Sequence, residues 1–425
     1  MNAAIISMLC LAQQWSQWRG PQGTGVAPEA NPPLEWSESE NLRWKVSLPG
    51  KGHSTPVIHG ERVFVTAAMA IGDALPPLAE LDPGAHDNDP VTHARRFLLT
   101  ALARKDGEVL WQRTLAETLP HAAVHSTGSY ASASPVTDGH AVFAFFGSYG
   151  LFAIDVDGAP LWEVDLGKMR VKHDHGEGSS PALHGETLVV NWDHEGESFV
   201  AAFDKQTGEE RWRKPRPSVT SWSTPLVVVH DDKPQVIVSG SGRVSSYALD
   251  DGEPLWECGG LSRNVVASPV AGDGMVYLAS SYEKQVMLGI ALEGAQGDIS
   301  DKDNVVWVRR KSTPYVPSPL LYGDALYILH HYQGTLSRLI ARSGEEPQRA
   351  QRLPGIRNVY ASPVGAAGRV YITDLDGTTL VLSHEAQPRV LAQNHLDDSF
   401  SASAAMAGDE LYLRGERFLY CIAEQ

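Results

Sequence analysis

Residues 132–162, SASPVTDGHAVFAFFGSYGLFAIDVDGAPLW, hold in one stretch the pattern that decides the fold. A Ser-Pro pair opens a short apolar segment, and an Asp-Gly turn leads into two further apolar segments. A second Asp-Gly turn then precedes Trp162. Asp-Gly favours tight hairpin turns, and short apolar runs between turn residues are typical of β-strands. We therefore predict four consecutive antiparallel strands in this stretch.

The same pattern repeats along the chain. An apolar pair follows most copies of the Ser/Thr-Pro at a constant distance, and an eighth copy, at Ser403, has lost the proline. Proline removes a ladder hydrogen bond and belongs on edge strands, such as the innermost strand of a propeller blade. Four strands in about 40–50 residues is the period of such a blade. The seven prolines are Pro56, Pro135, Pro181, Pro225, Pro269, Pro319 and Pro363.

A second motif places a tryptophan at the end of most copies. An alanine is followed by Asp-Gly or Thr-Gly and then, at a constant interval in four copies, by tryptophan, whereas the sixth and seventh copies have lost the tryptophan. We expect these indoles on the outermost strands to cover the small alanine of a neighbouring repeat and to staple adjacent sheets together. They are more plausible as packing staples than as a ligand cage. The residues are Trp111, Trp162, Trp212, Trp256 and Trp307.

The two ends of the chain are complementary. Residues 41–48 (NLRWKVSL) form a strand-like segment with no earlier strand to pair with, and the last copy stops at its third strand, residues 417–422 (RFLYCI). Pairing these segments closes the ring and leaves no edge unpaired. We predict an all-β, eight-bladed β-propeller over residues 41–425, with Trp44 as a further staple. Residues 13–40 are an N-terminal extension, and the polar insertion near residues 69–96 is predicted to be a loop.

Charge and the first residues bear on compartment and partners. The net charge of −16 repels phosphate backbones and anionic lipid, so we expect neither nucleic acid nor a membrane surface as a partner. The apolar run 3–12 (AAIISMLCLA) is too short to span a bilayer but suits a signal peptide. We therefore expect residues 1–12 to be a signal peptide and the chain to be periplasmic or secreted, and monomeric. No Lys or Arg precedes the run, so a cytosolic protein with an apolar N-terminus is the alternative.

The Ala…Asp-Gly…Trp series combined with Ser-Pro strands resembles the tryptophan-docking repeat of pyrroloquinoline-quinone (PQQ)-like propellers. The resemblance covers residues from about 41 to 425 and implies two branches. One contains quinoprotein dehydrogenases, which use adjacent cysteines, an acidic Ca²⁺ site under the quinone and a catalytic Asp. The other contains non-catalytic scaffolds similar to assembly factor B of the outer-membrane β-barrel machinery.

This sequence has no pair of adjacent cysteines. Our first hypothesis is therefore an exported, non-catalytic scaffold of the cell envelope that binds a protein or carbohydrate partner through its loop faces, with no cofactor. The alternative is a quinoprotein oxidoreductase that binds PQQ and Ca²⁺ at the channel mouth.

The densest polar cluster is residues 173–180 (HDHGEGSS), and a second polar group follows one strand later. In a blade, the loop before strand one and the loop after strand two lie at the same end, so the two groups can converge. We predict a hydrogen-bonded rim that binds a ligand or partner and assign no metal. A solvated loop is one alternative, and a metal ion is another, because imidazoles with carboxylates suit Zn²⁺ and oxygens alone suit Ca²⁺. The candidate residues are His173, His175, Glu177, Asp193, His194 and Glu195.

Two other polar groups give weaker functional signals. His330 and His331 are adjacent on a strand and point to opposite faces, so they cannot both ligate one ion as a strand pair, and we expect a structural role. A group of serines near two histidines lacks the GxSxG elbow of a hydrolase, and no catalytic residue is identified. That group is Ser126, Ser129 and Ser132 with His121 and His125.

Overall fold

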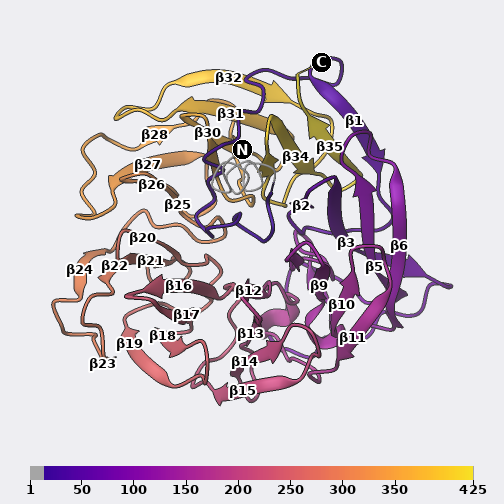
Figure 1. Ribbon diagram of the computed structural model, residues 1–425, viewed down its shortest axis with the longest axis horizontal. Helices are drawn as coiled ribbons and strands as arrows, with labels where there is room; N and C mark the ends of the chain where they lie inside the picture. Colours follow the sequence, from indigo (N-terminus) through magenta and orange to yellow (C-terminus); the bar gives the residue numbers. More distant parts are fainter. Residues whose placement is uncertain (1–13, 425) are drawn as a thin grey trace, which may run out of the picture.

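The computed structural model describes residues 14–424, and the predicted signal peptide at 1–12 lies outside them. Eight small antiparallel sheets are arranged as blades around a central axis, as predicted (Figure 1). From the axis outward, the first four are β2 (Val57–His59), β3 (Arg62–Ile71), β5 (Ala94–Ala103) and β6 (Val109–Thr118); β8 (Val136–Thr137), β9 (Ala141–Phe145), β10 (Leu151–Asp155) and β11 (Pro160–Val164); β12 (Ala182–His184), β13 (Thr187–Trp192), β14 (Phe199–Asp204) and β15 (Glu210–Pro215); and β16 (Leu226–His230), β17 (Lys233–Gly240), β18 (Arg243–Ala248) and β19 (Pro254–Gly259).

The second four complete the ring. They are β20 (Val270–Gly272), β21 (Met275–Ser280), β22 (Val286–Ala291) and β24 (Val305–Arg309); β25 (Leu320–Tyr322), β26 (Ala325–Leu329), β27 (Thr335–Ile340) and β28 (Gln351–Arg352); β29 (Val364–Ala366), β30 (Arg369–Thr373), β31 (Thr378–Ser383) and β32 (Val390–His395); and β33 (Ala405–Ala407), β34 (Glu410–Arg414), β35 (Phe418–Ile422) and β1 (Leu42–Ser47). The short β23 (Gly297–Asp298) adds a fifth strand beside β19, in the fourth blade.

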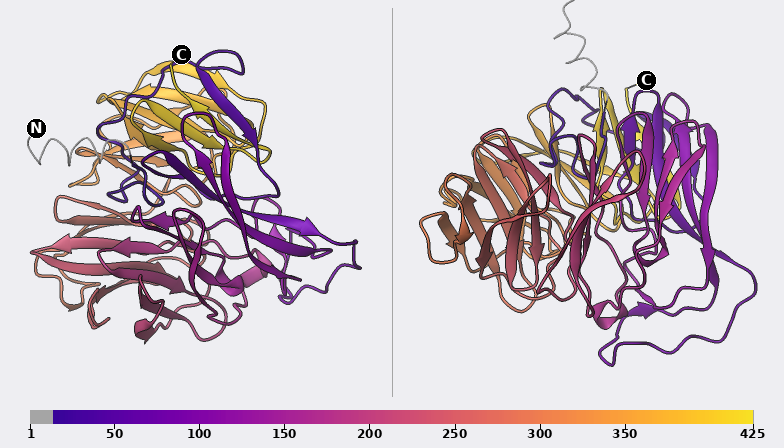
Figure 2. Two further views of the ribbon diagram at one scale, coloured as in Figure 1. Left: turned by 45° about the vertical axis from the view of Figure 1, so that its right-hand side comes forward. Right: turned by 60° about the horizontal axis from the view of Figure 1, so that its bottom comes forward.

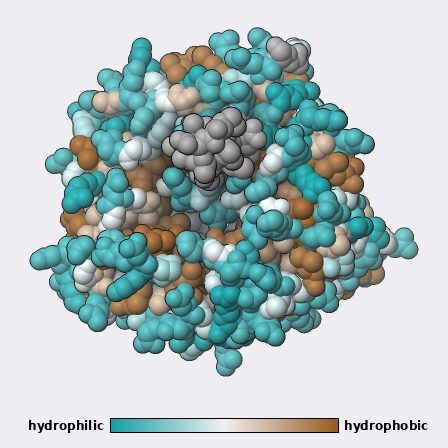
Figure 3. All heavy atoms as spheres, viewed as in Figure 1, coloured by the Kyte–Doolittle hydropathy of each residue, from teal (hydrophilic) through white to brown (hydrophobic). Residues whose placement is uncertain are grey.

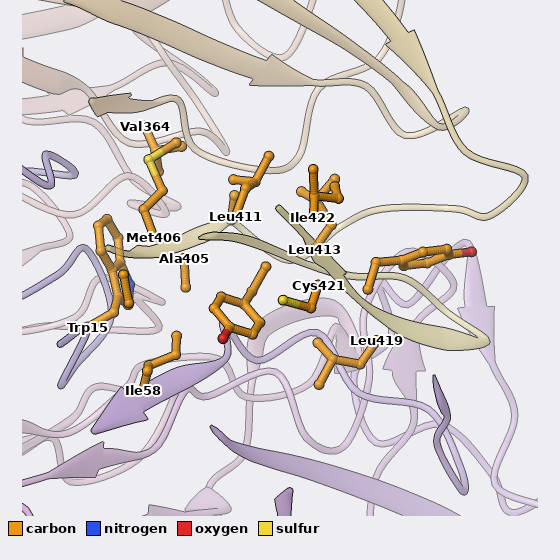
Figure 4. Packing of buried hydrophobic residues seen from close by; sticks show 14 of the residues in the cluster. Trp15, Ile58, Val364, Ala405, Met406, Leu411, Leu413, Leu419, Cys421 and Ile422 are labelled. Carbon is orange, nitrogen blue, oxygen red and sulfur yellow. The ribbon is translucent and has the colours of Figure 1, made fainter. Parts of the chain in front are cut away.

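The ring closes through the two ends of the chain. Strand β1 pairs antiparallel with β35, with Trp44 opposite Cys421 and Ser47 opposite Phe418. The predicted closure is therefore confirmed, and the largest buried cluster lies across it. In that cluster Trp15 lies near Ile58 and Met406, and Cys421 lies near Leu413 and Leu419 (Figure 4).

A hydrogen-bonded ring links the innermost strands of all eight blades. In seven successive steps, the backbone N–H of the Ser or Thr before each inner strand donates to the side-chain oxygen of its counterpart in the next blade, at 2.8–3.0 Å. Thr55 Oγ1 donates to Ser403 O at 3.0 Å and completes the circle. The Ser/Thr of the repeat thus satisfies a buried backbone donor that would otherwise be orphaned. The eight residues are Thr55, Ser134, Ser180, Thr224, Ser268, Ser318, Ser362 and Ser403.

Five tryptophans link neighbouring blades near the outer strands. Each indole Nε1–H donates to a backbone carbonyl of the following blade at 2.7–2.9 Å. Each ring also lies so close to a turn glycine of that blade that a Cβ would not fit there. The pairs are Trp44 on Gly107, Trp111 on Gly158, Trp162 on Gly208, Trp212 on Gly252 and Trp307 on Gly344.

Two details differ from the sequence-based expectation. The alanine of the motif faces the tryptophan of its own blade, as Ala202 does opposite Trp212, so the surface covered in the next blade is the glycine turn. Trp256 does not bridge to the next blade through its nitrogen. Its Nε1–H donates at 2.9 Å to Gln235 within its own sheet, where β23 covers the strand edge.

The insertion in the first blade is more ordered than predicted. Strands β3 and β5 continue as a paired ladder to Ile71 and Ala94, so only the middle of the predicted 69–96 loop is irregular. Within it, β4 (Asn88–Asp89) pairs with β7 (Val124–His125). The insertion, together with the extended β3–β5 hairpin that carries it, projects from the ring on the side away from the N-terminal segment (Figure 2).

The N-terminal extension closes one end of the channel. It crosses the centre of the ring in Figure 1 and exchanges backbone hydrogen bonds with inner strands on both sides, as Trp15 does with Ile58 and Ala27 with Gly365. The Arg19 guanidinium, 2% exposed, donates to Pro363 O at 2.7 Å and to Pro319 O at 2.8 Å. Burial lowers the pKa of Arg19 to about 9. The extension is thus a plug anchored by a buried cation.

The surface seen from the plugged side is mostly hydrophilic (Figure 3), in keeping with the acidic net charge. None of the helices in residues 14–424 is long and apolar enough to cross a membrane.

The staple geometry makes a stability prediction. Trp212 is 7% exposed, packs on Gly252 and donates to Leu249 O at 2.7 Å. Trp212→Ala should lower the free energy of unfolding by about 3–5 kcal/mol, because it leaves a cavity between two blades. Leu161→Ala on the outer strand β11, where the side chain is 51% exposed, is the control and should change it by less than about 0.5 kcal/mol. Urea unfolding measures both, and a loss below about 1 kcal/mol for Trp212→Ala would contradict a packed interblade role.

Candidate functional site

A blind cavity occupies the open end of the channel, opposite the plug. Its volume is 410 Å³, and Trp18 of the plug contributes to its lining. Hydroxyl-bearing members of the inner ring, among them Ser180, Thr224 and Ser268, also line it. The insertion of the first blade, the loops that precede the inner strands and the loops that follow the second strands form the rest of its wall. The cavity is therefore framed by residues of the repeat, and the side chains that give it its chemistry come from segments that are not part of the repeat.

Histidines line the side formed by the first three blades. His86 comes from the insertion, His125 from β7, and His173 and His175 from the 3₁₀ turn η2 (Lys172–Asp174) and the residue after it. The ring centre of His86 lies 5.0 Å from the ring centre of His173 and 4.8 Å from that of His175. His175 is also 4.7 Å from His125. Four imidazoles from three distant segments thus meet, and three of them, His86, His125 and His175, line the cavity.

Aromatic rings line the opposite side, formed by blades five to seven. Tyr315 stacks on His331 with ring centres 4.8 Å apart and planes 12° apart, and on Tyr282 at 5.7 Å. Tyr332 contacts His331 at 4.5 Å and stacks on Tyr360 at 5.8 Å. These five residues, four tyrosines and His331, all border the cavity and are called the aromatic wall.

The cavity carries little positive charge. Among the described residues, no Lys or Arg lines it, and its carboxylates are Asp87 and Glu177. Burial, reinforced by nearby Lys51 and Arg414, lowers the pKa of His53 to about 3. Burial and the neighbouring imidazoles lower the pKa of His175 to about 4. The histidines at these positions are therefore neutral near pH 7.

Glu177 faces the same space. Its carboxylate accepts the Ser148 backbone N–H at 2.6 Å and the Ser148 hydroxyl at 2.5 Å. Burial raises the pKa of Glu177 to about 7 despite these two donors. Glu177 also borders a small adjoining cavity of 30 Å³ that reaches Asn191 and Asp193.

The second half of the predicted cluster is engaged elsewhere. Asp193 forms a buried ion pair with Arg216, with oxygen-to-nitrogen distances of 2.8 and 3.1 Å. His194 Nδ1 accepts the Arg170 N–H at 3.1 Å, and the Glu195 carboxylate accepts the Thr220 hydroxyl at 2.8 Å. These three residues hold loops together, whereas His173, His175 and Glu177 lie at or beside the channel cavity.

The serines and histidines that the sequence analysis considered separately lie partly in the frame and partly at the cavity. Ser132 Oγ donates to Ser129 O at 2.8 Å, and His330 Nε2 bonds the Ser337 hydroxyl at 2.7 Å, both within the frame. His331, by contrast, belongs to the aromatic wall. In the described part of the chain, the one group of three His or acidic residues with donor atoms within 4.8 Å of one another is His230, Asp231 and Glu293, at the surface.

Sequence reasoning singled out His331 but missed His86 and the grouping of the four tyrosines. Tyr282, Tyr315, Tyr332 and Tyr360 occupy different blade positions, so no spacing connects them. A usable signal was their location: each lies in a loop at the end of the blade where the Ser-Pro strands begin.

Comparison with known families now places the chain. The family model described as outer membrane protein assembly factor BamB matches residues 34–191 and 196–424. The chain belongs to this family. No curated protein sequence gives a significant match.

Solved structures share the BamB-family fold at low identity. BamB from Moraxella catarrhalis is 15% identical with a TM-score of 0.58, and the alignment covers 84% of this chain and 98% of that one. A europium-containing methanol dehydrogenase is 12% identical with a TM-score of 0.63, covering 97% and 91%. The computationally designed Ika8 protein is 11% identical with a TM-score of 0.60, covering 90% and 99%. At these identities the likeness shows the fold alone.

His53 makes a pH prediction. Its pKa falls from the ordinary 6.5 to about 3 on folding, so the unfolded chain takes up the proton first and the native state loses stability as pH falls from 6.5 toward 3. Between about pH 7 and pH 4.5, wild type should lose roughly 2–3 kcal/mol more unfolding free energy than His53→Asn. Chemical denaturation at both pH values measures this. The exposed-site control His184→Asn should behave as wild type, and equal losses in wild type and His53→Asn would refute the assignment.

Proposed function

We propose that the chain is an exported, non-catalytic scaffold of the cell envelope that binds a protein partner at the open end of its channel. The observation that carries the proposal is the blind cavity with an aromatic wall, whose described lining holds two carboxylates and no Lys or Arg. Aromatic rings that present both a face and a hydroxyl are enriched where proteins bind one another. The family is described as an outer membrane protein assembly factor, and a role in assembling proteins supports a protein partner.

The cavity suits an inserted side chain or short segment. A volume of 410 Å³ falls within the range of pockets that enclose small ligand groups. An apolar or aromatic group can stack on Tyr315 and Tyr332, while the ring hydroxyls satisfy its polar atoms. A carboxylate would find no Lys or Arg among the described lining residues and would sit near Glu177. The partner group is therefore neutral or cationic.

A carbohydrate is the other partner that the sequence left open, since a sugar face also stacks on tyrosine. We favour protein because the tyrosines lie at the rim, with Tyr282 48% exposed, where a large surface can engage the surrounding loops as well.

The quinoprotein alternative fits the residues poorly. PQQ is a planar quinone with several carboxylates, and the described lining of the channel cavity offers no Lys or Arg to pair with them. Cys258 and Cys421 are separate, buried and free. Asp87 and Glu177 are the carboxylates of the lining, and the Glu177 oxygens already accept two hydrogen bonds from Ser148. We therefore derive no reaction through this cofactor.

Site-specific photo-crosslinking tests the scaffold proposal. A benzophenone amino acid replaces Tyr282 at the cavity rim or, as the control, Leu161 on the outer strand β11, both about half exposed. In envelope extracts of the source cells, the rim position should give one discrete protein adduct, and the control should give none. Adding Tyr315→Ala should weaken the adduct, because Tyr315 supports Tyr282. Equal labelling at both positions, or an adduct lost on glycosidase treatment, would count against a protein partner.

Titration with PQQ and Ca²⁺ tests the alternative. The full chain should show no saturable binding by calorimetry or by a change in quinone absorbance. Stoichiometric, Ca²⁺-dependent binding that is lost in Glu177→Gln would favour the oxidoreductase instead.

A further inference from the structure

Three histidine rings are in mutual contact, and two of them, those of His86 and His175, line the channel cavity. The ring centres of His86, His173 and His175 lie 5.0, 4.8 and 5.3 Å apart in the three pairs. His125 touches His175 from the outer side. We propose that His86, His173 and His175 bind one divalent transition metal ion, such as Zn²⁺, at the edge of the cavity.

The hydrogen bonds leave a metal-binding nitrogen on each ring. His86 Nδ1 bonds Gly84 O at 2.8 Å, and His175 Nε2 bonds His86 O at 3.3 Å. A carbonyl oxygen can only accept, so these nitrogens carry the protons, and Nε2 of His86 and Nδ1 of His175 keep their lone pairs. His173 Nδ1 is buried and has no hydrogen-bond partner among the described residues.

His125 is not counted as a ligand. Its Nδ1 accepts the Thr127 N–H at 3.2 Å, which places the proton on Nε2, the nitrogen that remains. Three histidines leave one coordination position for water or for a donor group of a molecule in the cavity, as in open zinc sites.

Other contacts hold the segments that carry the three rings. Asn88 Nδ2 donates to His173 O at 2.8 Å, and the His173 N–H donates to Asp82 at 2.8 Å. The Asp174 carboxylate accepts the Leu81 N–H at 2.5 Å. These bonds fix the insertion against the turn at 172–175, so the segments that carry the three rings are held together before an ion binds.

The local backbone is strained at this point. Asp87, His173 and Asp174 have φ values of 54°, 59° and 52°, in the left-handed region that side chains disfavour. Asp82 and Asp87 lie close by and favour a cation.

Binding requires the rings to turn. The three histidines do not appear among the groups whose donor atoms lie within 4.8 Å of one another, so rotation about the side-chain torsions must bring the nitrogens to one point. Such a rotation keeps the ring centres nearly in place. The exposed group of His230, Asp231 and Glu293 already meets that distance and is the competing site to be excluded by experiment.

Zn²⁺ titration of the full chain, produced without a His-tag and stripped with chelator, tests the proposal. Calorimetry should show one saturable site, with binding at least about tenfold weaker in His86→Ala and in His175→Ala. His184→Ala, at an exposed histidine, and His230→Ala should both bind as wild type. Zn²⁺ should also slow proteolysis within residues 72–93 in wild type but not in His86→Ala.

His86 lies on the insertion outside the blade frame, so His86→Ala should keep the wild-type thermal midpoint without metal, which separates lost binding from lost folding. No saturable Zn²⁺ binding would overturn the proposal. So would binding that is retained in His86→Ala and His175→Ala but lost in His230→Ala.

Discussion

The ring of hydrogen bonds around the channel is the constraint on which the blade arrangement depends. Each inner strand begins with a backbone N–H buried beside the next blade, and the neighbouring Ser or Thr hydroxyl is its acceptor. An unsatisfied buried donor costs about 1–3 kcal/mol, so the hydroxyl is needed at each step. The last copy shows which residue matters, because it lacks the proline yet Ser403 still accepts the Ser362 N–H at 2.9 Å. Proline shapes the strand, and the hydroxyl connects the blades.

The outer links are less regular, and the N-terminal extension compensates where they are missing. Tryptophan staples run from the eighth blade through the third and again at the fifth. The seventh blade has none, and there Trp36 of the extension stacks on Tyr371 at 6.4 Å while its backbone N–H donates to Asn394 at 2.9 Å. With Arg19 bonded to two inner-strand carbonyls, the extension both plugs the channel and packs against the weakly stapled blades.

The features that could be predicted are those that local pattern encodes. Blade number and closure followed from repeated strand and turn signals, and the tryptophan positions followed from a constant spacing. The exception, Trp256, depends on the small strand β23, which carries no repeat signal. The site could not be predicted because it joins irregular segments from different blades. Asp193 was predicted to lie at the rim, and the structure pairs it with Arg216. No repeat or spacing in the sequence connects His86 with His175, whose rings are in contact.

The same distinction explains where function resides. Residues of the repeat are engaged in holding the ring, so chemistry at the channel mouth comes from departures from the repeat: the insertion with His86, the 173–177 turn, and the tyrosines of the later blades. A ring closed by the pairing of β1 with β35 can hold such segments in costly conformations, including the left-handed residues Asp87 and His173. Rigid blades and a strained, histidine-rich rim are therefore connected, because the packing free energy of the blades offsets the conformational cost of the rim.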